Sequence, residues 1–209
     1  MTTRADTPQP PAASSGRPRV AVSFFEDLYE SAEDPWSFAT SEYERRKYAH
    51  TLSSLGAPRF ERALEVGCSI GVFTELLASM TGELVAIDVS ARALARADKR
   101  LHERLHERRG VRFARASFPE QMPAGPWNLI VCSEILYYLD RDAFALAADR
   151  LRECLESGST VIAVHWRAAT RTYPLLGDEV HDRLVAALGA WHALDDRRPQ
   201  YRLDRFEGR

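Results

Sequence analysis

The stretch RALEVGCSIGVFTELL, residues 62–77, changes its hydrophobic pattern at two glycines. Before Gly67 it is an almost continuous apolar run, interrupted by Glu65. After Gly71 the apolar residues return at helical spacing. A glycine turn between a strand and a helix lets the backbone bend tightly and approach a ligand closely. In an open parallel sheet, ligands bind at the carboxyl ends of the strands, where such turns lie.

Strands and helices alternate along the rest of the chain. Short apolar runs occur at Ala63–Val66, Leu84–Ile87, Val111–Ala114, Asn128–Cys132 and Thr160–His165. Helical patterns occupy Val72–Met80, Ala91–Arg108, Asp142–Glu156 and Gly177–Leu188. This alternation predicts a doubly wound, Rossmann-like α/β sheet with helices on both faces. The segments WHALDD and YRLDRFE flank Arg197-Arg198-Pro199 and predict an antiparallel C-terminal hairpin.

The N-terminal third differs from this pattern. Residues 1–19 are rich in Pro, Ser, Thr and Ala and predict a disordered leader. Helices are expected near Val20–Ser31 and at Ser41–Leu55, the second with Ser41 as N-cap and Glu44 as its capping-box partner. We expect one domain from residue 20 to 209, with a helical cap over residues 20–60 and a ligand-binding core over residues 61–209.

Composition excludes several classes of function. The net charge is −2, so no global basic field for nucleic acid is expected. No run reaches the ~18 apolar residues of a membrane span, and no signal-peptide core begins the chain. The widely spaced Cys68, Cys132 and Cys154 favour reduced thiols over a disulfide or zinc site. A cytoplasmic protein is therefore predicted.

The glycine turn favours a cationic nucleoside cofactor. Asp88 ends the second apolar run 21 residues after Gly67, where an acid accepts hydrogen bonds from ribose hydroxyls. A dinucleotide site needs a third glycine and a P-loop needs Gly-Lys-Ser/Thr, and both are missing. Glu65 repels phosphates but attracts the ammonium and sulfonium groups of S-adenosylmethionine. The alternative is an ordinary turn with a core-facing Glu65.

Three motifs resemble those of class I S-adenosylmethionine-dependent methyltransferases: EVGCSIGVFT at residues 65–74, AIDVS at 86–90 and PWNLIVCSEILYYL at 126–139. The resemblance implies a sheet of seven strands, with S-adenosyl-L-methionine as cofactor and S-adenosyl-L-homocysteine as product. It assigns the cofactor to Glu65, Gly67, Cys68, Ser69, Gly71, Asp88, Val89, Ser117, Phe118 and Ser133. Ser69 replaces a common middle glycine, and Ser117 replaces the Asp that usually contacts the adenine amino group.

A narrower resemblance lies in the flanks of these motifs. DPWSFATSEYERRKYAHTL at residues 34–52, SEILYYL and VHWRAATRTYPLLGDEVH at 164–181 resemble the NodS-like methyltransferases. In that group, nodulation proteins N-methylate the free amine of a deacetylated chitooligosaccharide. The resemblance implies N-methylation of an amino-sugar-containing oligosaccharide or small molecule. Alternatives are O- or C-methylation of a natural-product scaffold, a non-catalytic binder of the cofactor, and a nicotinamide-dependent reductase.

Residues at the ends of later strands are the candidates for chemistry. An amine must lose its proton before it attacks a methyl group, so His165 and Glu134 are candidate general bases. The alternatives are a neutral His165 bonded to backbone and a Glu134 that begins a helix. Tyr137 and Tyr138 follow, as a catalytic and an acceptor-binding residue. Because they are adjacent, we expect at least one of them to face the core.

The remaining candidates flank the expected site. Asp178 and His181 are predicted to bind the acceptor, with a surface capping pair as the alternative. Trp36, Tyr43 and Arg46 (or Lys47) are predicted to form a lid that reaches the methionine carboxylate, with core packing as the alternative. His165, His181 and Glu134 lack metal-ligand spacing, so no metal is expected. YRLDRFE, if it is an exposed edge strand, would pair two subunits in a homodimer.

Overall fold

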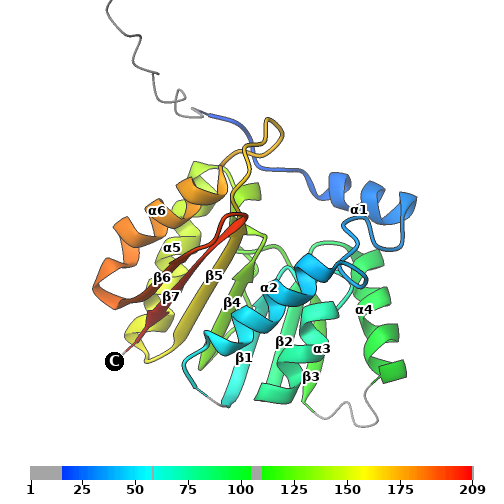
Figure 1. Ribbon diagram of the computed structural model, residues 1–209, viewed down its shortest axis with the longest axis horizontal. Coiled ribbons are helices and arrows are strands. Elements are labelled where there is room, and N and C mark those ends of the chain that lie inside the picture. Colours follow the sequence, from blue (N-terminus) through cyan, green and yellow to red (C-terminus); the bar gives the residue numbers. More distant parts are fainter. Residues whose placement is uncertain (1–15, 58, 105–109, 209) are drawn as a thin grey trace, which may run out of the picture.

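The centre of the molecule is a seven-stranded sheet with the strand order β3-β2-β1-β4-β5-β7-β6 (Figure 1). It comes from a computed structural model that describes residues 16–57, 59–104 and 110–208. Strands β1 to β5 pair in parallel, whereas β7 runs antiparallel to both β5 and β6. The strands are β1 Phe60–Val66, β2 Thr81–Asp88, β3 Val111–Arg115, β4 Leu129–Ser133, β5 Thr160–Trp166, β6 His192–Arg197 and β7 Tyr201–Glu207. The predicted doubly wound fold with its C-terminal hairpin is confirmed.

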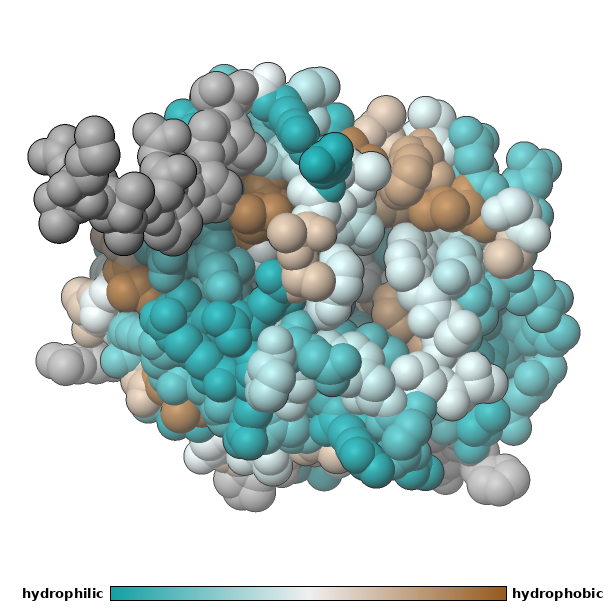
Figure 2. Space-filling model, turned by 45° about the horizontal axis from the view of Figure 1, so that its top comes forward, coloured by the Kyte–Doolittle hydropathy of each residue, from teal (hydrophilic) through white to brown (hydrophobic). Residues whose placement is uncertain are grey.

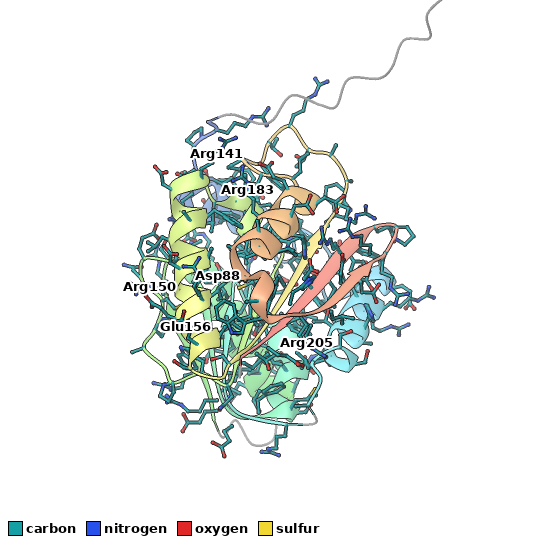
Figure 3. All side chains as sticks on the ribbon, turned by 90° about the vertical axis from the view of Figure 1, so that its left-hand side faces the viewer. Asp88, Arg141, Arg150, Glu156, Arg183 and Arg205 are labelled. Carbon is teal, nitrogen blue, oxygen red and sulfur yellow. The ribbon has the colours of Figure 1, made fainter. Side chains whose placement is uncertain are left out.

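Helices cover both faces of the sheet. They are α1 Val22–Ser31, α2 Glu42–Ser53, α3 Val72–Leu77, α4 Ala91–Arg104, α5 Arg141–Glu156 and α6 Gly177–Leu188, with short 3₁₀ helices η1 Ala78–Met80, η2 Leu136–Tyr138 and η3 Gly189–Trp191. Charged residues such as Arg150 lie on the outer side of α5 (Figure 3).

Alternating side chains of the strands separate the two halves of the core. Ile130 of β4 belongs to a buried cluster with Leu151 of α5 and Leu184 of α6. Its neighbour Val131 belongs to a second cluster, which contains Tyr48 of α2 and Phe73 of α3. The strands are apolar on both faces because each face is covered by helices.

The N-terminal helices begin and end close to the predicted positions. The Ser41 side chain accepts the Glu44 amide at 3.3 Å, so the N-cap of α2 is confirmed. The Glu44 carboxylate bonds Lys47 instead of returning to the cap. Most of the predicted leader, residues 1–15, lies outside the described residues. Its last part contacts the body of the protein, because Arg19 bonds Ser117 and Glu120.

Two predictions about elements need correction, and a third is only partly covered by the described residues. β7 lies between β5 and β6, so YRLDRFE is not an edge strand and the structure gives no support for pairing subunits through it. The described edges are β3 and β6. The helix expected over Val72–Met80 is α3 followed by the 3₁₀ turn η1. The expected end of the Ala91–Arg108 helix falls on residues 105–109, which lie outside the described part of the chain.

Candidate functional site

A cavity of about 390 Å³ opens at the carboxyl ends of β1, β2 and β4. β1 and β4 are neighbours in the sheet although two strands separate them along the chain. This is the switch point where open α/β sheets bind ligands. Hydrophobic side chains gather around the hollow on this side of the molecule, between more hydrophilic outer parts (Figure 2). Of the 19 predicted site residues, those that line the cavity are Trp36, Tyr43, Glu65, Gly67, Cys68, Ser69, Asp88, Val89, Phe118, Ser133, Glu134, Tyr137 and Tyr138.

The glycine turn is held by hydrogen bonds from β2. The amides of Gly67 and Cys68 both donate to the Ile87 carbonyl, at 2.8 and 2.9 Å. The Ser69 amide donates to Oδ2 of Asp88 at 2.9 Å. Gly67 has a φ of 77° and Ser69 a φ of 51°. Ser69, which stands at the position of the usual middle glycine, therefore adopts the left-handed backbone conformation that favours glycine. We call Glu65, Gly67, Ser69 and Asp88 the turn end of the cavity.

Asp88 both fixes this turn and faces the cavity. Its Oδ1 accepts the Ser90 amide at 2.9 Å, while Oδ2 accepts Ser69. A carboxylate oxygen has two lone-pair sites, so each oxygen keeps acceptor capacity for a ligand hydroxyl.

Glu65 is the one acid of the turn end with a free oxygen. It is 4% exposed, and its Oε2 has no hydrogen-bond partner among the described residues. Burial raises the pKa of Glu65 to about 8; the Thr74 hydroxyl opposes this shift, and the nearby Asp88 charge adds to it. A buried carboxylate without a partner is costly. A cationic ligand group would satisfy it, so the turn end fits an ammonium.

Apolar side chains and one arginine form the wall beyond Asp88. Val89 and Phe118 line the cavity, and so does Arg19. Arg19 donates to the Ser117 hydroxyl at 2.8 Å and to the Phe118 carbonyl at 2.6 Å. Ser117 itself does not line the cavity, whereas Arg19, which the sequence analysis missed, does.

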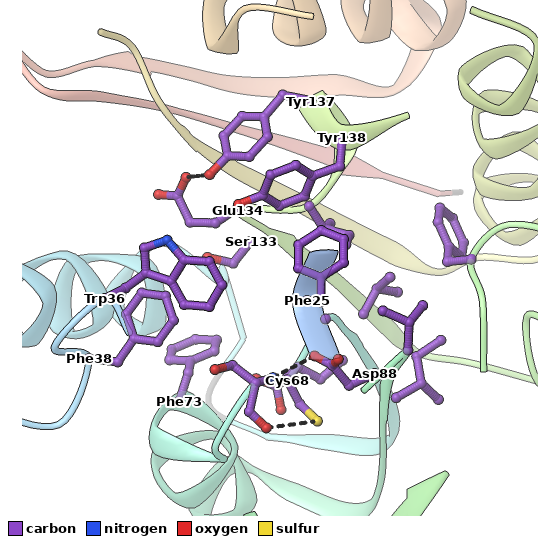
Figure 4. Close-up of a pocket in the computed structure, with 18 of the residues that line it drawn as sticks. Phe25, Trp36, Phe38, Cys68, Phe73, Asp88, Ser133, Glu134, Tyr137 and Tyr138 are labelled. Atoms are coloured by element: carbon purple, nitrogen blue, oxygen red, sulfur yellow. Dashed lines mark hydrogen bonds between the residues drawn. The ribbon is translucent and has the colours of Figure 1, made fainter. Parts of the chain in front are cut away.

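At the opposite end of the cavity, the Glu134 carboxylate accepts hydrogen bonds from three donors. Its Oε1 accepts Lys47 Nζ at 2.5 Å, and its Oε2 accepts the Tyr137 hydroxyl at 2.7 Å and the Trp166 amide at 3.0 Å. We call Lys47, Glu134, Tyr137 and Tyr138 the tyrosine end. Figure 4 shows Glu134 and Tyr137 joined by their hydrogen bond, with Asp88 on the far side of the aromatic rings.

Lys47 of α2 is buried between two acids. Its side chain is 1% exposed and bonds Glu44 at 3.0 Å as well as Glu134. Burial alone lowers the pKa of Lys47, but the carboxylates of Glu134 and Glu44 outweigh it and raise that pKa. Arg46, the predicted lid residue beside it, is exposed, bonds Glu42 and does not line the cavity. The cation of α2 that reaches the cavity is therefore Lys47.

Both neighbouring tyrosines line the cavity, and both also belong to a buried core cluster, which confirms the expectation that at least one of them packs in the core. Their rings lie 4.6 Å apart at nearly right angles. They belong to the 3₁₀ turn η2, where consecutive side chains are rotated without the alternation of a strand. Tyr173 stacks on Tyr137 at 4.9 Å, and Phe25 packs on Tyr138 at 4.9 Å. The tyrosine end is thus an aromatic box around one ionic cluster.

His165, Asp178 and His181 do not line the cavity. His165 and His181 are fully buried behind it, on β5 and α6. Asp178 forms an ion pair with Arg167 at 2.8 Å. The prediction that helical spacing places Asp178 and His181 over the cavity is therefore wrong: His181 is buried in the protein interior, and Asp178 lies outside the cavity lining.

Gly71 also lies outside the cavity lining. Its φ is 77°, and a Cβ there would come within 2.9 Å of the Ala97 side chain. The absence of a side chain at Gly71 therefore lets the start of α3 pack closely against α4. Aromatic residues that do line the cavity and escaped the sequence analysis are Phe25, Tyr29, Phe38, Tyr48, Phe73, Trp166 and Tyr173.

Within the described ranges no group of three His, Cys, Asp or Glu side chains is arranged to hold a metal ion. Cys68, Cys132 and Cys154 are free thiols. No described helix has the length and apolar character needed to cross a membrane.

Comparisons with known proteins agree with this geometry. The pattern of the family described as Nodulation protein S (NodS) matches residues 25–172. Nodulation protein S of Sinorhizobium fredii (strain NBRC 101917 / NGR234) is 39% identical over 111 residues, which cover 53% of this chain and 50% of that protein. The chain thus spans about half the length of the curated relatives that it matches.

Two solved structures extend the likeness to the fold. The N-methyltransferase NodS from Bradyrhizobium japonicum WM9 in complex with S-adenosyl-L-homocysteine superposes with a TM-score of 0.72 at 22% identity, covering 90% of this chain and 98% of that one. A second structure of NodS from the same source has a TM-score of 0.67 at 27% identity and covers 81% and 98%.

Proposed function

The chain belongs to the NodS family, and from this premise we propose that it is an S-adenosylmethionine-dependent methyltransferase that methylates an amino group of an amino-sugar-containing acceptor. The observation that carries the choice of cofactor is the unpartnered, buried Oε2 of Glu65 at the switch point of the sheet. A pyrophosphate would be repelled there, whereas an amino acid ammonium supplies the missing donor.

The turn end holds the cofactor in this proposal. S-adenosylmethionine, when bound, supplies the electrophilic methyl group. Glu65 accepts hydrogen bonds from the ammonium of the methionine part. Asp88 accepts the ribose hydroxyls on the lone pairs that Ser69 and Ser90 leave free. Val89 and Phe118 provide an apolar surface for the base, with Arg19 at its rim.

The tyrosine end orients the acceptor. The Tyr137 hydroxyl donates to Glu134, so its oxygen is left as an acceptor for an amine N–H. Burial and the Glu134 carboxylate raise the pKa of Tyr137 well above its usual value, which keeps the hydroxyl protonated. The acceptor would react as its neutral amine, after its ammonium form has lost a proton to water. The bound cofactor would supply the methyl group to the nitrogen lone pair and leave as S-adenosylhomocysteine, and the methylated ammonium would then lose a proton to water.

Aromatic walls supply the selectivity for a ring. Trp36 stacks on Phe38 with ring centroids 5.5 Å apart, and Tyr138 presents a second aromatic surface across the cavity. Aromatic faces pack against the apolar faces of sugar rings while their edges leave hydroxyls accessible. Positioning of the amine in line with the sulfonium then provides most of the rate enhancement.

Two measurements test the proposal in sequence. Calorimetric titration should detect binding of S-adenosylhomocysteine and no binding of NADH; binding of NADH alone would refute the cofactor assignment. Methyl-labelled S-adenosylmethionine is then offered with a deacetylated chitooligosaccharide and, as control, with its fully N-acetylated form. Label in the deacetylated sugar only is the expected result. Tight binding of S-adenosylhomocysteine without transfer of the methyl label to any acceptor would identify a non-catalytic binding protein instead.

A further inference from the structure

A row of buried polar side chains lies behind the tyrosine end, and none of them lines the cavity. His165 of β5, His181 of α6 and Asp204 of β7 are each 0% exposed. His165 Nδ1 lies 3.2 Å from His181 Nε2, and His181 Nδ1 is hydrogen-bonded to Oδ2 of Asp204. At the end nearest the cavity, the row contacts the backbone of η2: the Leu136 amide donates a hydrogen bond to His165 Nε2 at 3.1 Å.

The Leu136 contact determines where the protons of the row lie. A backbone N–H is always a donor, so His165 Nε2 must be unprotonated to accept it. Neutral His165 then carries its proton on Nδ1 and donates to His181 Nε2. His181 Nε2 is consequently an acceptor, and its own proton sits on Nδ1, facing the Asp204 carboxylate. Every ring nitrogen of the two histidines is thereby matched.

Asp204 is itself fixed from two other sides. Arg202, 1% exposed, lies 3.0 Å from its Oδ2 through Nε. His192 of β6 contacts Oδ1 at 2.7 Å. A carboxylate anchored by an arginine in this way acts only as a hydrogen-bond acceptor, so His181 must donate to it from Nδ1 and the donor–acceptor direction of the whole row is fixed at Asp204.

We propose that His165 is a positioning residue for the segment Glu134–Tyr138, and that His181 and Asp204 hold it in the one tautomer that can accept the Leu136 amide. The inference rests on the proposed function, because that segment carries the groups assigned to the acceptor. It replaces the prediction of His165 as general base: both of its ring nitrogens are engaged, and neither reaches the cavity.

The segment needs such an anchor because its backbone is unfavourable at the start. Glu134 has a φ of 57°, in the left-handed region that non-glycine residues rarely adopt. Such a residue persists only when its surroundings hold it. On the cavity side Glu134 is held by Lys47, Tyr137 and Trp166, and on the interior side Leu136 is held by His165. Burial, together with His181 and Lys47, lowers the pKa of His165 well below its usual value, which matches a ring that stays neutral.

Two substitutions separate positioning from the other roles. His165→Gln can place an amide oxygen near the position of Nε2 and keep an acceptor for Leu136. His165→Asn can keep a donor near the position of Nδ1 but leaves the Leu136 amide without a partner. If His165 were a general base, both variants would lose that base equally. If His165 only packed, the effect would depend on side-chain volume and not on which hydrogen-bonding group is kept.

The expected result is a split between these variants. His165→Gln keeps kcat within about 3-fold, whereas His165→Asn loses about 10- to 100-fold, the effect of one unsatisfied buried amide. The KM for S-adenosylmethionine changes by less than about 3-fold in both, because the turn end is untouched. The exposed His102→Asn on α4 serves as control and changes neither parameter. Equal losses of kcat in the Gln and Asn variants would overturn the proposal.

A second readout does not depend on catalysis, and its first part uses the unaltered protein alone. Nitrogen-detected NMR of the imidazoles in the unaltered protein should show both His165 and His181 as neutral tautomers protonated at Nδ1. A proton on His165 Nε2 contradicts the proposal even if the protein proves to be a methyltransferase. Conversely, the Nδ1 tautomers with faster hydrogen exchange of the Leu136 amide in His165→Asn than in His165→Gln would support it even if no acceptor is methylated.

Discussion

The turn end and the tyrosine end of the cavity treat their polar atoms in opposite ways. At the turn end, Glu65 keeps an oxygen without a partner, and Asp88 keeps lone pairs beyond those used by the backbone. At the tyrosine end, both oxygens of Glu134 are already bonded to donors of the protein. The first arrangement is completed by a ligand, and the second is complete without one.

This difference indicates separate roles for the two ends in the proposed reaction. An incomplete, buried carboxylate supplies affinity for a cation, because binding removes the cost of leaving it unpaired. A complete ionic cluster supplies rigidity, because moving any member breaks several hydrogen bonds at once. In the proposed reaction the turn end therefore selects the cofactor, while the tyrosine end holds the aromatic box proposed to align the acceptor amine.

The largest effect is expected from breaking the ionic cluster at Lys47. Lys47→Met leaves the carboxylates of Glu44 and Glu134 facing each other, largely buried and without their shared cation. Removal of one partner from a buried ion pair costs about 3–5 kcal/mol, because the remaining charge is not compensated. Urea denaturation should show a loss of this size in the free energy of unfolding.

The neighbouring Arg46→Met is the matched control, because Arg46 is exposed on the same helix and pairs only at the surface. It should change the free energy of unfolding by no more than about 0.5 kcal/mol. In the double variant Lys47→Met with Glu134→Gln, part of the lost stability should return. Equal changes in the Lys47 and Arg46 variants would show that the tyrosine end is not held by this cluster.

An intermediate effect is expected at Glu65, where the missing partner is the ligand. Glu65→Gln should weaken S-adenosylhomocysteine binding by about 10- to 100-fold near pH 8, the loss of one charge-assisted hydrogen bond. In the unaltered protein the pKa of Glu65 is raised to about 8, so below that pH a cationic ligand must displace a proton. Calorimetry should therefore show affinity that rises toward pH 8 in the unaltered protein and stays flat in Glu65→Gln.

The same carboxyl group sets a pH dependence of stability with a definite sign. Its folded-state pKa, about 8, lies above the ordinary 4.5, so the folded protein binds this proton more tightly than the unfolded chain. The ligand-free protein should consequently lose stability as the pH rises from about 4.5 to about 8. Thermal unfolding of Glu65→Gln lacks this component. A steeper decline in Glu65→Gln than in the unaltered protein would contradict the assignment.

The two ends also differ in how far the sequence could predict them. Glu65, Gly67 and Asp88 lie at fixed offsets from one strand and its neighbour, so a short motif was enough to place them together. Lys47 and Arg46 are adjacent on a helix with charges on most sides, and only packing against the sheet decides which one turns inward. His165 was correctly placed at a strand end, but its partners come from α6 and β7, far along the chain. No local pattern carries that information.

The smallest effect concerns the boundary of the turn end, which two glycines with the same φ of 77° can locate. Gly67→Ala and Gly71→Ala carry the same backbone cost, about 1–2 kcal/mol. A Cβ at Gly71 meets the Ala97 side chain at 2.9 Å, away from the cavity, whereas one at Gly67 stands 3.2 Å from Ile135 on the cavity wall.

Gly71→Ala should therefore lower stability, in part restored by Ala97→Gly, while the folded fraction keeps its affinity for S-adenosylhomocysteine within about 2-fold. Gly67→Ala should lower both stability and affinity. If Gly71→Ala weakens binding as much as Gly67→Ala does, Gly71 belongs to the turn end after all, and the line drawn between ligand contact and helix packing is in the wrong place.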